Sequence, residues 1–483
     1  MALYLGIDLG TSGVKALALA EGGAIVAEAQ APLTVSHPQA LWSEQAPDDW
    51  WAAADKAVRG VLSQIDRAAV QAIGLSGQMH GATVLGVDDK PLRPAILWND
   101  GRAFAECAAL EQAVPNSRAI TGNIAMPGFT APKIAWLREH EPKVADKIAK
   151  VLLPKDYLRL VMTGDHASDM SDSAGTLWLD VAARAWSDEM LAATGLTRDH
   201  MPKLYEGPQV TGRLRAEIAA GWGVAQMPVV AGGGDNAAGA VGIGVTQPGQ
   251  GFLSLGTSGV YFVAGDKFRP NPAGAVHAFC HALPDTWHQM AVMLSAASCL
   301  DWAARLTGAK DVATLMASAE AAEAPAAPLH FLPYLTGERT PHNDPKARGV
   351  LFGLGPDVTQ GQIGQAVLQG VAFGLADGQR VLQAAGTSIE SVTAIGGGAQ
   401  SQYWLQILAN VLDQPLLLRE GSEVGPALGA ARLAQMGVTG ADASMLTAPP
   451  IRAEIVPNPN QQPRLNDLYE SWQALYPALK DHF

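Results

Sequence analysis

The six residues Leu-Gly-Thr-Ser-Gly-Val occur twice in the chain, at residues 9–14 and 255–260. Two glycines flank the Thr-Ser pair in each copy, so backbone N–H groups can point into the turn where no Cβ blocks a phosphate. Each copy adds hydroxyl donors, which are those of Thr11, Ser12, Thr257 and Ser258. One copy alone is typical of an ordinary tight turn. Two copies, each flanked by apolar runs, favour two phosphate-binding hairpins that hold a polyphosphate from both sides.

A carboxylate stands beside the first copy only. Asp8 precedes Gly10 by two residues, and the second copy has no acidic residue next to it. Beside a triphosphate, a lone carboxylate at a strand end suits Mg²⁺, bound directly or through water. The alternative for Asp8 is a cap of the turn.

A second carboxylate, Asp235, follows three glycines in the stretch Ala-Gly-Gly-Gly-Asp-Asn. A strand-to-helix turn is expected here, and an N-cap is the simplest role for Asp at such a turn. Phosphoryl transfer to a hydroxyl needs positioning, Mg²⁺ and a proton acceptor, so a general base is the other role. One side chain can serve both purposes.

A third glycine-rich turn, Gly396 to Gly398, lies between an apolar run and a helical pattern. Ser401 occupies the position where a dinucleotide fingerprint requires its last glycine, so that motif is absent. No Gly-x-x-x-x-Gly-Lys-Ser/Thr segment occurs either. The turn is better interpreted as a flat floor for adenine or ribose.

The histidines and cysteines do not form a recognised metal pattern. His277, Cys280, His281 and His288 are close in sequence, but their spacing matches no zinc motif and Pro284 disfavours a helix there. We expect packing roles for these histidines. The chain has three cysteines, an odd and widely spaced set that fits a reducing cytoplasm.

Composition narrows the class of protein further. The chain has 483 residues, which favours two domains, and 46 acidic against 33 basic residues give a net charge of −13. This acidity, without a basic run, argues against nucleic acid as a partner. No apolar run reaches the ~18 residues of a membrane helix, and no export signal is visible, so a cytoplasmic protein without a membrane partner is expected.

The order of predicted elements indicates how these residues are positioned. Residues 3–19 read as a hairpin, and a helix, a strand into a Gly-flanked loop and further helices follow. A second hairpin opens the same series again, so we expect an α/β protein with domains at 1–244 and 245–483.

Several motifs together resemble a known superfamily. GIDLGTSGVK, SLGTSGV and IGGGAQSQYW are similar to the phosphate and adenosine motifs of the sugar kinase/actin/heat-shock chaperone ATPases. MPGFTAPKIAWL and GVLFGL with QIGQAVLQGVAFGLADG resemble the two signatures of FGGY carbohydrate kinases. The resemblance covers essentially the whole chain and implies two ribonuclease-H-like domains around a deep interdomain cleft.

The resemblance also implies roles for individual residues. Asp235 corresponds to the catalytic base and Asp8 to the carboxylate that positions Mg²⁺ and phosphate. The other implied contacts are with the sugar, at Gln78, Met79, His80 and Asn236; with the phosphates, at Gly10, Thr11, Ser12, Gly256 and Thr257; and with adenosine, at Gly397 and Gly398. ATP and Mg²⁺ are the implied cofactors. Which of residues 98–102 and 126–136 touch the substrate stays open.

The implied substrate is a ketose. SGQMHG, WNDGR, LLPKDYLRL and GGGDNAAGAVG are similar to the family members that phosphorylate D-xylulose. Glycerol-phosphorylating members carry Arg-Glu where this chain has Met79-His80, which argues against glycerol. Another ketose or polyol, or a non-catalytic nucleotide-gated sugar sensor, is the alternative, and a homodimer stays open.

Overall fold

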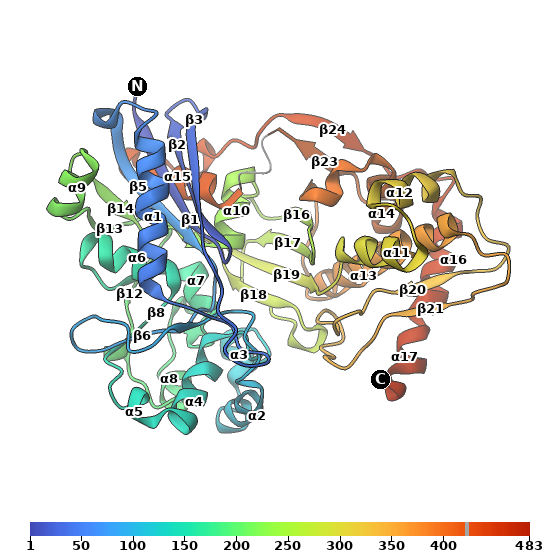
Figure 1. Ribbon diagram of the computed structural model, residues 1–483, viewed down its shortest axis with the longest axis horizontal. Coiled ribbons are helices and arrows are strands. Elements are labelled where there is room, and N and C mark those ends of the chain that lie inside the picture. Colours follow the sequence, from blue (N-terminus) through green and yellow to red (C-terminus); the bar gives the residue numbers. More distant parts are fainter. Residues whose placement is uncertain (421–424) are drawn as a thin grey trace.

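The computed structural model describes residues 1–420 and 425–483, which form two α/β halves arranged side by side (Figure 1). Each half contains a sheet of seven strands. In both sheets an antiparallel hairpin supplies the first strand, which also pairs in parallel with a later strand. The repeat in the sequence is therefore a repeat in the structure, and the α/β class is confirmed.

The first sheet runs in the order β13-β14-β5-β1-β2-β3, with β15 paired to β5. Its strands are β1 Leu3–Leu9, β2 Gly13–Ala20, β3 Ile25–Pro32, β5 Val70–Gly77, β13 Val210–Arg213, β14 Pro228–Val230 and β15 Gly233–Gly234. Alternate residues of β1 point to opposite faces. Leu5 and Ile7 pack in the cluster that contains Trp50 of α1, whereas Tyr4 packs with Ala427 of α15. Helices on both faces explain why β1 has no charged residue before Asp8.

The other elements of the first half surround this sheet. Its helices are α1 Pro47–Leu62, α2 Phe104–Ala113, α3 Ser117–Thr121, α4 Thr130–His140, α5 Pro142–Ala145, α6 Pro154–Thr163, α7 Met170–Ala174, α8 Asp188–Ala193, α9 Ala216–Trp222 and α10 Asp235–Ile243. Its short strands are β4 Glu44–Gln45, β6 Thr83–Leu85, β7 Ala95–Ile96, β8 Lys150–Leu152, β9 Ala167–Asp169, β10 Leu179–Asp180, β11 Ala185–Trp186 and β12 Lys203–Tyr205. The helix predicted after Trp42 is α1, which begins with a proline and two aspartates, as helix starts favour.

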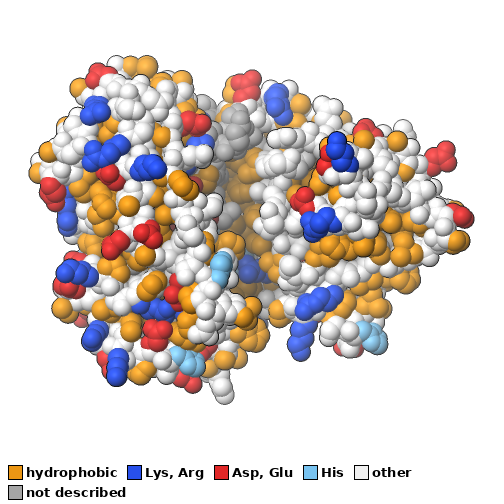
Figure 2. Space-filling view, in the orientation of Figure 1, with side chains coloured by type: hydrophobic (Ala, Val, Ile, Leu, Met, Phe, Trp, Pro, Cys, Tyr) orange, Lys and Arg blue, Asp and Glu red, His pale blue; other side chains and the backbone are white. Residues whose placement is uncertain are grey.

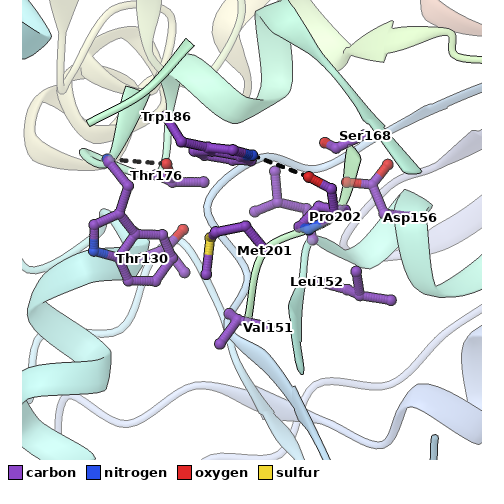
Figure 3. Close-up of a pocket in the computed structure, with 11 residues that line it drawn as sticks. Thr130, Val151, Leu152, Asp156, Ser168, Thr176, Trp186, Met201 and Pro202 are labelled. Carbon is purple, nitrogen blue, oxygen red and sulfur yellow. Dashed lines mark hydrogen bonds between the residues drawn. The ribbon is translucent and has the colours of Figure 1, made fainter. Parts of the chain in front are cut away.

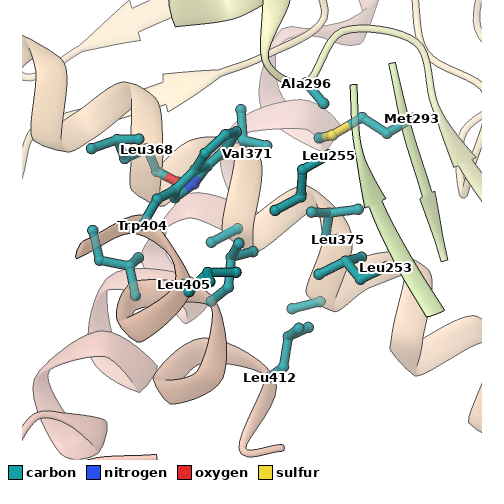
Figure 4. Packing of buried hydrophobic residues seen from close by; sticks show 14 of the residues in the cluster. Leu253, Leu255, Met293, Ala296, Leu368, Val371, Leu375, Trp404, Leu405 and Leu412 are labelled. Atoms are coloured by element: carbon teal, nitrogen blue, oxygen red, sulfur yellow. The ribbon is translucent and has the colours of Figure 1, made fainter. Parts of the chain in front are cut away.

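The second sheet runs in the order β18-β19-β17-β16-β22-β23-β24. Its strands are β16 Gln250–Leu255, β17 Gly259–Gly265, β18 His277–Cys280, β19 Trp287–Met293, β22 Ser391–Ile395, β23 Leu416–Arg419 and β24 Ile451–Ile455, and β20 His330–Leu332 pairs with β21 Val350–Phe352 apart from it. The helices are α11 Ser298–Thr307, α12 Val312–Ala321, α13 Gln360–Ala384, α14 Gln402–Leu412, α15 Gly425–Thr439, α16 Gln462–Gln473 and α17 Leu475–Leu479. The core of this half forms where Trp404 of α14 packs among Leu255, Leu368 and Leu405 (Figure 4).

Helix α15 belongs to the second half of the sequence but packs on the first sheet (Figure 1). Close approach is possible because Gly6 and Gly74 have no side chain. A Cβ on Gly6 would lie 1.9 Å from the carbonyl oxygen of Ala427, and one on Gly74 would lie 1.9 Å from that of Ala430. The boundary at 244/245 stays a prediction, and α15 is the element that crosses back over it.

Within the part of the chain that the structure describes, no helix is both long and apolar enough to cross a bilayer. The longest helix, α13, has 25 residues and begins with a capping box formed by Thr359 and Gln362. It carries a buried aspartate, Asp377, which forms an ion pair with the exposed Arg380 one turn later at 3.3 Å.

Candidate active site

The first Gly-Thr-Ser-Gly turn closes the hairpin between β1 and β2. The N–H of Gly10 donates to the carbonyl of Gly13 at 2.9 Å, which fixes the turn. The carbonyl of Thr11 accepts from Gln45 Nε2 at 2.8 Å, and that of Ser12 accepts from the N–H of Leu33 at 2.9 Å. Both carbonyl oxygens are thus bonded to the protein, while the amides of Thr11 and Ser12 have no partner among the described residues. A turn with this arrangement offers donors to an anion.

The second turn, between β16 and β17, is one residue tighter, but its carbonyl oxygens are also bonded to the protein. The N–H of Gly256 donates to the carbonyl of Ser258 at 3.1 Å. The carbonyls of Gly256 and Thr257 accept from the amides of Ala297 and Ala296, each at 2.9 Å. Thr257 and Ser258 are exposed. In both turns, carbonyl oxygens are bonded to neighbouring segments of the protein. The amides of Thr11, Ser12 and Thr257 are left without a partner among the described residues.

Strand register brings the two carboxylates together. Asp8 on β1 pairs with Ser76 on β5, and Ser76 pairs in turn with Gly233 on β15. Asp235 follows two residues after Gly233, at the start of α10. Both carboxylates therefore lie at the same edge of the first sheet, one strand apart. In the second copy of the repeat, Ser254 stands at the sequence position of Asp8, so only one side carries a carboxylate.

The electrostatics of this edge fit a cation. Burial raises the pKa of Asp8 to about 7, and the nearby charge of Asp235 contributes to that rise. One carboxylate oxygen of Asp8, Oδ1, is buried and has no hydrogen-bond partner in the described chain. Mg²⁺ usually takes one or two carboxylate oxygens from a protein, so the unpartnered oxygen of Asp8 fits such a cation.

Asp235 is the first residue inside α10 and not its N-cap, which is Gly234. The N-cap alternative for Asp235 is therefore wrong, because its side chain accepts from the next residue only. Asn236 donates to Oδ1 of Asp235 through its backbone N–H at 2.7 Å and its Nδ2 at 2.9 Å. Oδ2 has no partner among the described residues. Burial raises the pKa of Asp235 to about 6, while the bonds from Asn236 lower it.

The side-chain amide of Gln78, which we expected to contact sugar, forms hydrogen bonds within the protein. Its Oε1 accepts from the Thr11 hydroxyl at 3.0 Å, and its Nε2 donates to Gln45 Oε1 at 3.0 Å. The Thr11 hydroxyl also accepts from Trp98 Nε1 at 2.9 Å. In this state Gln78 and Thr11 support each other, and only the backbone amide of Thr11 is available to a phosphate.

Met79 and His80 line the edge next to Asp235. Met79 is 5% exposed, and a Cβ on Gly234 would lie 2.9 Å from its Cγ, so the glycine makes room for this apolar side chain. His80 has φ of 67°, an unusual value for a non-glycine residue that is common at functional sites. Its Nδ1 lies 2.6 Å from the carbonyl of Gly175, so Nδ1 carries the proton and donates.

His80 is a neutral acceptor in this pocket. Burial lowers its pKa to about 3, and the positive charges of Lys133 and Arg339 lower it as well. With Nδ1 donating to Gly175, Nε2 keeps a lone pair that can accept a hydrogen bond. The His80 ring also lies 4.8 Å from the Phe129 ring, in an edge-to-face arrangement.

The residues that hold the loop around His80 in place were not predicted from the sequence. Lys133, on α4, is fully buried and donates to the carbonyls of His80 at 2.9 Å and Gly128 at 2.7 Å. Thr130 donates to the same His80 carbonyl at 3.1 Å. The segment 126–136 therefore supports the loop, and no local pattern could show this, since the partners lie about 50 positions apart.

Residues 98–102 support the first hairpin from the other side. Trp98 contacts Thr11, and Asp100 accepts from the N–H of Ser43 at 2.6 Å. Arg102 stacks on Trp42, with its guanidinium carbon 3.6 Å from the ring centre. This wall is built mainly from contacts within the protein.

The glycine-rich turn of the second half lines a cavity of about 790 Å³. Gly396 and Gly397 form part of its wall, together with Ser254, Arg419 and Gly425 at the start of α15. Gly398 lies behind the wall instead, where a Cβ would be 2.5 Å from the Trp404 ring. Figure 2 shows that the surface is hollowed between the two halves. The size and open floor suit a nucleoside.

Three other features do not include any of the residues assigned above to sugar, phosphate or adenosine. A cavity of about 10 Å³ beneath Trp186 and Met201, where Trp186 Nε1 donates to the carbonyl of Pro202 at 3.0 Å, holds a water at most (Figure 3). His277, His281 and His288 are buried on or beside β18 and β19, as expected for packing residues. The three cysteines are free and buried.

Two duplicated hairpins with outward amides, a carboxylate pair at one sheet edge and a nucleoside-sized cavity define a two-domain phosphotransferase with the sugar kinase/actin/heat-shock chaperone ATPase fold. The N-terminal domain of the FGGY family of carbohydrate kinases matches residues 3–242, and its C-terminal domain matches residues 251–438. The chain belongs to the FGGY family of carbohydrate kinases. It is an enzyme that uses a sugar and ATP.

Curated relatives and solved structures agree with this assignment. The chain is 55% identical to the xylulose kinase of Escherichia coli K12, covering 99% of this chain and 100% of that protein, and 37% identical to that of Bacillus subtilis, covering 90% and 88%. A crystal structure described as a "xyloylose kinase" from Brucella ovis superposes with a TM-score of 0.96 at 50% identity and full coverage of both chains. A Plasmodium falciparum glycerol kinase with ADP, 19% identical with 98% and 97% coverage and a TM-score of 0.88, shares the fold.

Proposed function

We propose that this chain transfers the γ-phosphoryl group of ATP to D-xylulose and forms D-xylulose 5-phosphate. The observation that carries the proposal is the position of Asp235, whose Oδ2 is unpartnered beside Met79 and the neutral His80. The high identity to xylulose kinases over whole chains supports the choice of sugar. The Met79-His80 pair supports a ketose over glycerol, because it offers an apolar floor and one acceptor.

In this proposal Asp235 accepts the proton of the sugar hydroxyl that attacks the γ-phosphorus. Its pKa of about 6 leaves it largely ionised at neutral pH and still able to take a proton. Asn236 holds Oδ1, so Oδ2 is the oxygen that receives the proton. His80 Nε2 and the Met79 side chain orient the sugar, and Gly234 leaves the space that Met79 occupies.

The two hairpins hold the phosphates from opposite halves through the amides of Thr11, Ser12 and Thr257, while the amide of Gly256 closes its own turn. Mg²⁺ would be held by Asp8, whose orphaned Oδ1 fits it, and would supply charge compensation for the phosphates. Gly397 and Gly398 form and support the adenosine floor. The proposal applies equally to a single chain or a homodimer, because every residue named comes from one chain. Three free cysteines support a cytoplasmic location.

The test is ADP release with a panel of ketoses, sugar acids and polyols, followed by ³¹P NMR of the product. We expect D-xylulose to give the highest kcat/KM and the phosphate to be on C5. If another sugar gave the highest kcat/KM, that sugar would replace D-xylulose as the substrate, and the proposed phosphoryl transfer would stay the same. Absence of sugar-dependent ADP release with every sugar would contradict the kinase function.

A further inference from the structure

Arg339 belongs to the second half, yet it lies next to the sugar-binding face of the first. It follows Leu-Thr-Gly-Glu in the loop between β20 and β21. No role was predicted for this segment from the sequence. Its Nη1 lies 3.4 Å from Nε2 of His277 on β18. The His277 ring is 5.6 Å from the Phe129 ring, which in turn packs 4.8 Å from His80. Two packed rings, those of His277 and Phe129, thus connect Arg339 to His80.

The loop holds the Arg339 backbone firmly. Oε1 of Glu338 accepts from the N–H of Leu294 at 2.9 Å and from that of Arg339 at 2.7 Å. Thr340 accepts from the N–H of Val292 at 2.9 Å and donates to the carbonyl of Ala275 at 3.0 Å. Two neighbours of Arg339 therefore tie it to β19, and its side chain is presented from a fixed base.

Only one nitrogen of the Arg339 guanidinium group, Nη1, contacts a hydrogen-bond partner among the described residues. His277 donates from Nδ1 to Asn123 Oδ1 at 2.9 Å, so its Nε2 is an acceptor for one Arg339 N–H. Nε and Nη2 of Arg339 have no partner among the described residues. Glu338 does not neutralise the charge at pH 7, because burial raises the pKa of Glu338 to about 8. The charge of Arg339 reaches His80, since it lowers the pKa of that imidazole.

Resting on the proposed function, we propose that Arg339 is a sugar ligand supplied by the second half, which donates Nε and Nη2 to a carbonyl or hydroxyl oxygen of the substrate opposite His80. The two groups are complementary, because His80 offers a lone pair and Arg339 offers donors only. A sugar that touches both would join the two halves. Sugar binding would then favour the closed arrangement in which both hairpins reach one ATP molecule.

The test compares Arg339→Gln and Arg339→Lys with a matched control, Arg305→Gln, which alters an exposed arginine on α11. Steady-state kinetics use the sugar on which the wild-type enzyme is fastest. We expect Arg339→Gln to raise the KM for sugar by about 10–100-fold, as loss of a charged hydrogen bond does, and Arg339→Lys to raise it less. The KM for ATP, the sugar-free ATPase rate and the melting temperature should stay near wild type, as should all values for Arg305→Gln.

An unchanged KM for sugar in Arg339→Gln would overturn the inference. It would also be overturned if the KM for sugar, the KM for ATP and the melting temperature changed together in both variants, since that pattern indicates a structural role. Failure of the proposed function is distinguishable, because it appears in the wild-type enzyme as a preference for a sugar other than D-xylulose or as no turnover.

Discussion

Asp8 and Asp235 stand at the same edge of the first sheet, separated by the end of β5, and the charge of Asp235 contributes to the raised pKa of Asp8. A pair of carboxylates kept close at the expense of mutual repulsion is typical of sites that bind a cation and move a proton. Their different surroundings suggest different roles. Oδ1 of Asp8 is buried and unpartnered, whereas Asp235 has one oxygen fixed by Asn236 and the other free.

Replacing Asp235 by Asn should lower kcat by about 10²–10⁴-fold, because the proton acceptor is lost while the shape is kept. The KM values for sugar and ATP should change little. A slow sugar-free ATPase, in which Asp235 activates water, should disappear in Asp235→Ala. Asp301→Asn, an exposed aspartate in the first turn of α11, is the matched control. Near-normal turnover in folded Asp235→Asn would remove this residue from the mechanism.

The rate should depend on pH through Asp235. The base acts only when ionised, and its pKa is raised to about 6, so kcat/KM should fall as the pH falls through this value. A bound cation stabilises the ionised form, so the midpoint with saturating Mg²⁺ should lie between about pH 5 and pH 6. The measurement is a rate profile from pH 5 to pH 8, with circular dichroism to confirm that the fold persists. A profile that is flat down to pH 5 would speak against Asp235 as the base.

The ionised Asp8 side chain should lower the free energy of unfolding when no metal is bound. Its native pKa of about 7 exceeds the unfolded value, so the native state binds the proton more tightly and the free energy of unfolding falls as pH rises through this range. Asp8→Asn removes this penalty. In EDTA at pH 8 it should raise the free energy of unfolding by about 1–3 kcal/mol, with almost no effect near pH 4.

Thermal melting of wild type and Asp8→Asn at both pH values checks this prediction. Added Mg²⁺ should raise the melting temperature of the wild type and leave that of Asp8→Asn almost unchanged. A variant that melts lower than wild type at pH 8 without metal would show that Asp8 is not electrostatically strained.

The docking of α15 predicts a large difference between two glycines of the first half. Gly6→Ala places a Cβ 1.9 Å from the carbonyl oxygen of Ala427, so helix and sheet must separate, whereas Gly22→Ala meets nothing within 4 Å. We expect Gly6→Ala to destabilise the protein by more than about 2 kcal/mol and Gly22→Ala to have almost no effect. Equal melting temperatures for the two variants would contradict the close packing of α15.

The sequence predicts the parts of this site that depend on local patterns. The Gly-Thr-Ser-Gly repeat predicts both hairpins because turn geometry is set by a few adjacent residues, and the helix after Gly234 is predicted for the same reason. The proximity of Asp8 and Asp235 follows from strand order, which no local pattern encodes. The same holds for the position of α15.

Side-chain partners are the least predictable part. Gln78 resembles a sugar contact in its motif, but long-range bonds to Gln45 and Thr11 occupy its amide in this structure. Lys133 gives no sign in the sequence that it holds the carbonyl of His80. Such contacts depend on tertiary packing, so they require coordinates.

The most direct test of the account is the ratio of kcat/KM for D-xylulose to that for glycerol, measured with one enzyme preparation and saturating ATP and Mg²⁺. A pocket built from Met79, His80 and Asn236 around a larger sugar leaves polar groups unpaired when glycerol binds. We predict a ratio of about 10³ or more. His80→Ala should give a smaller ratio, because it should impair D-xylulose more than glycerol, and it should leave the KM for ATP largely unchanged. Comparable efficiencies for glycerol and D-xylulose in the wild-type enzyme would contradict the account.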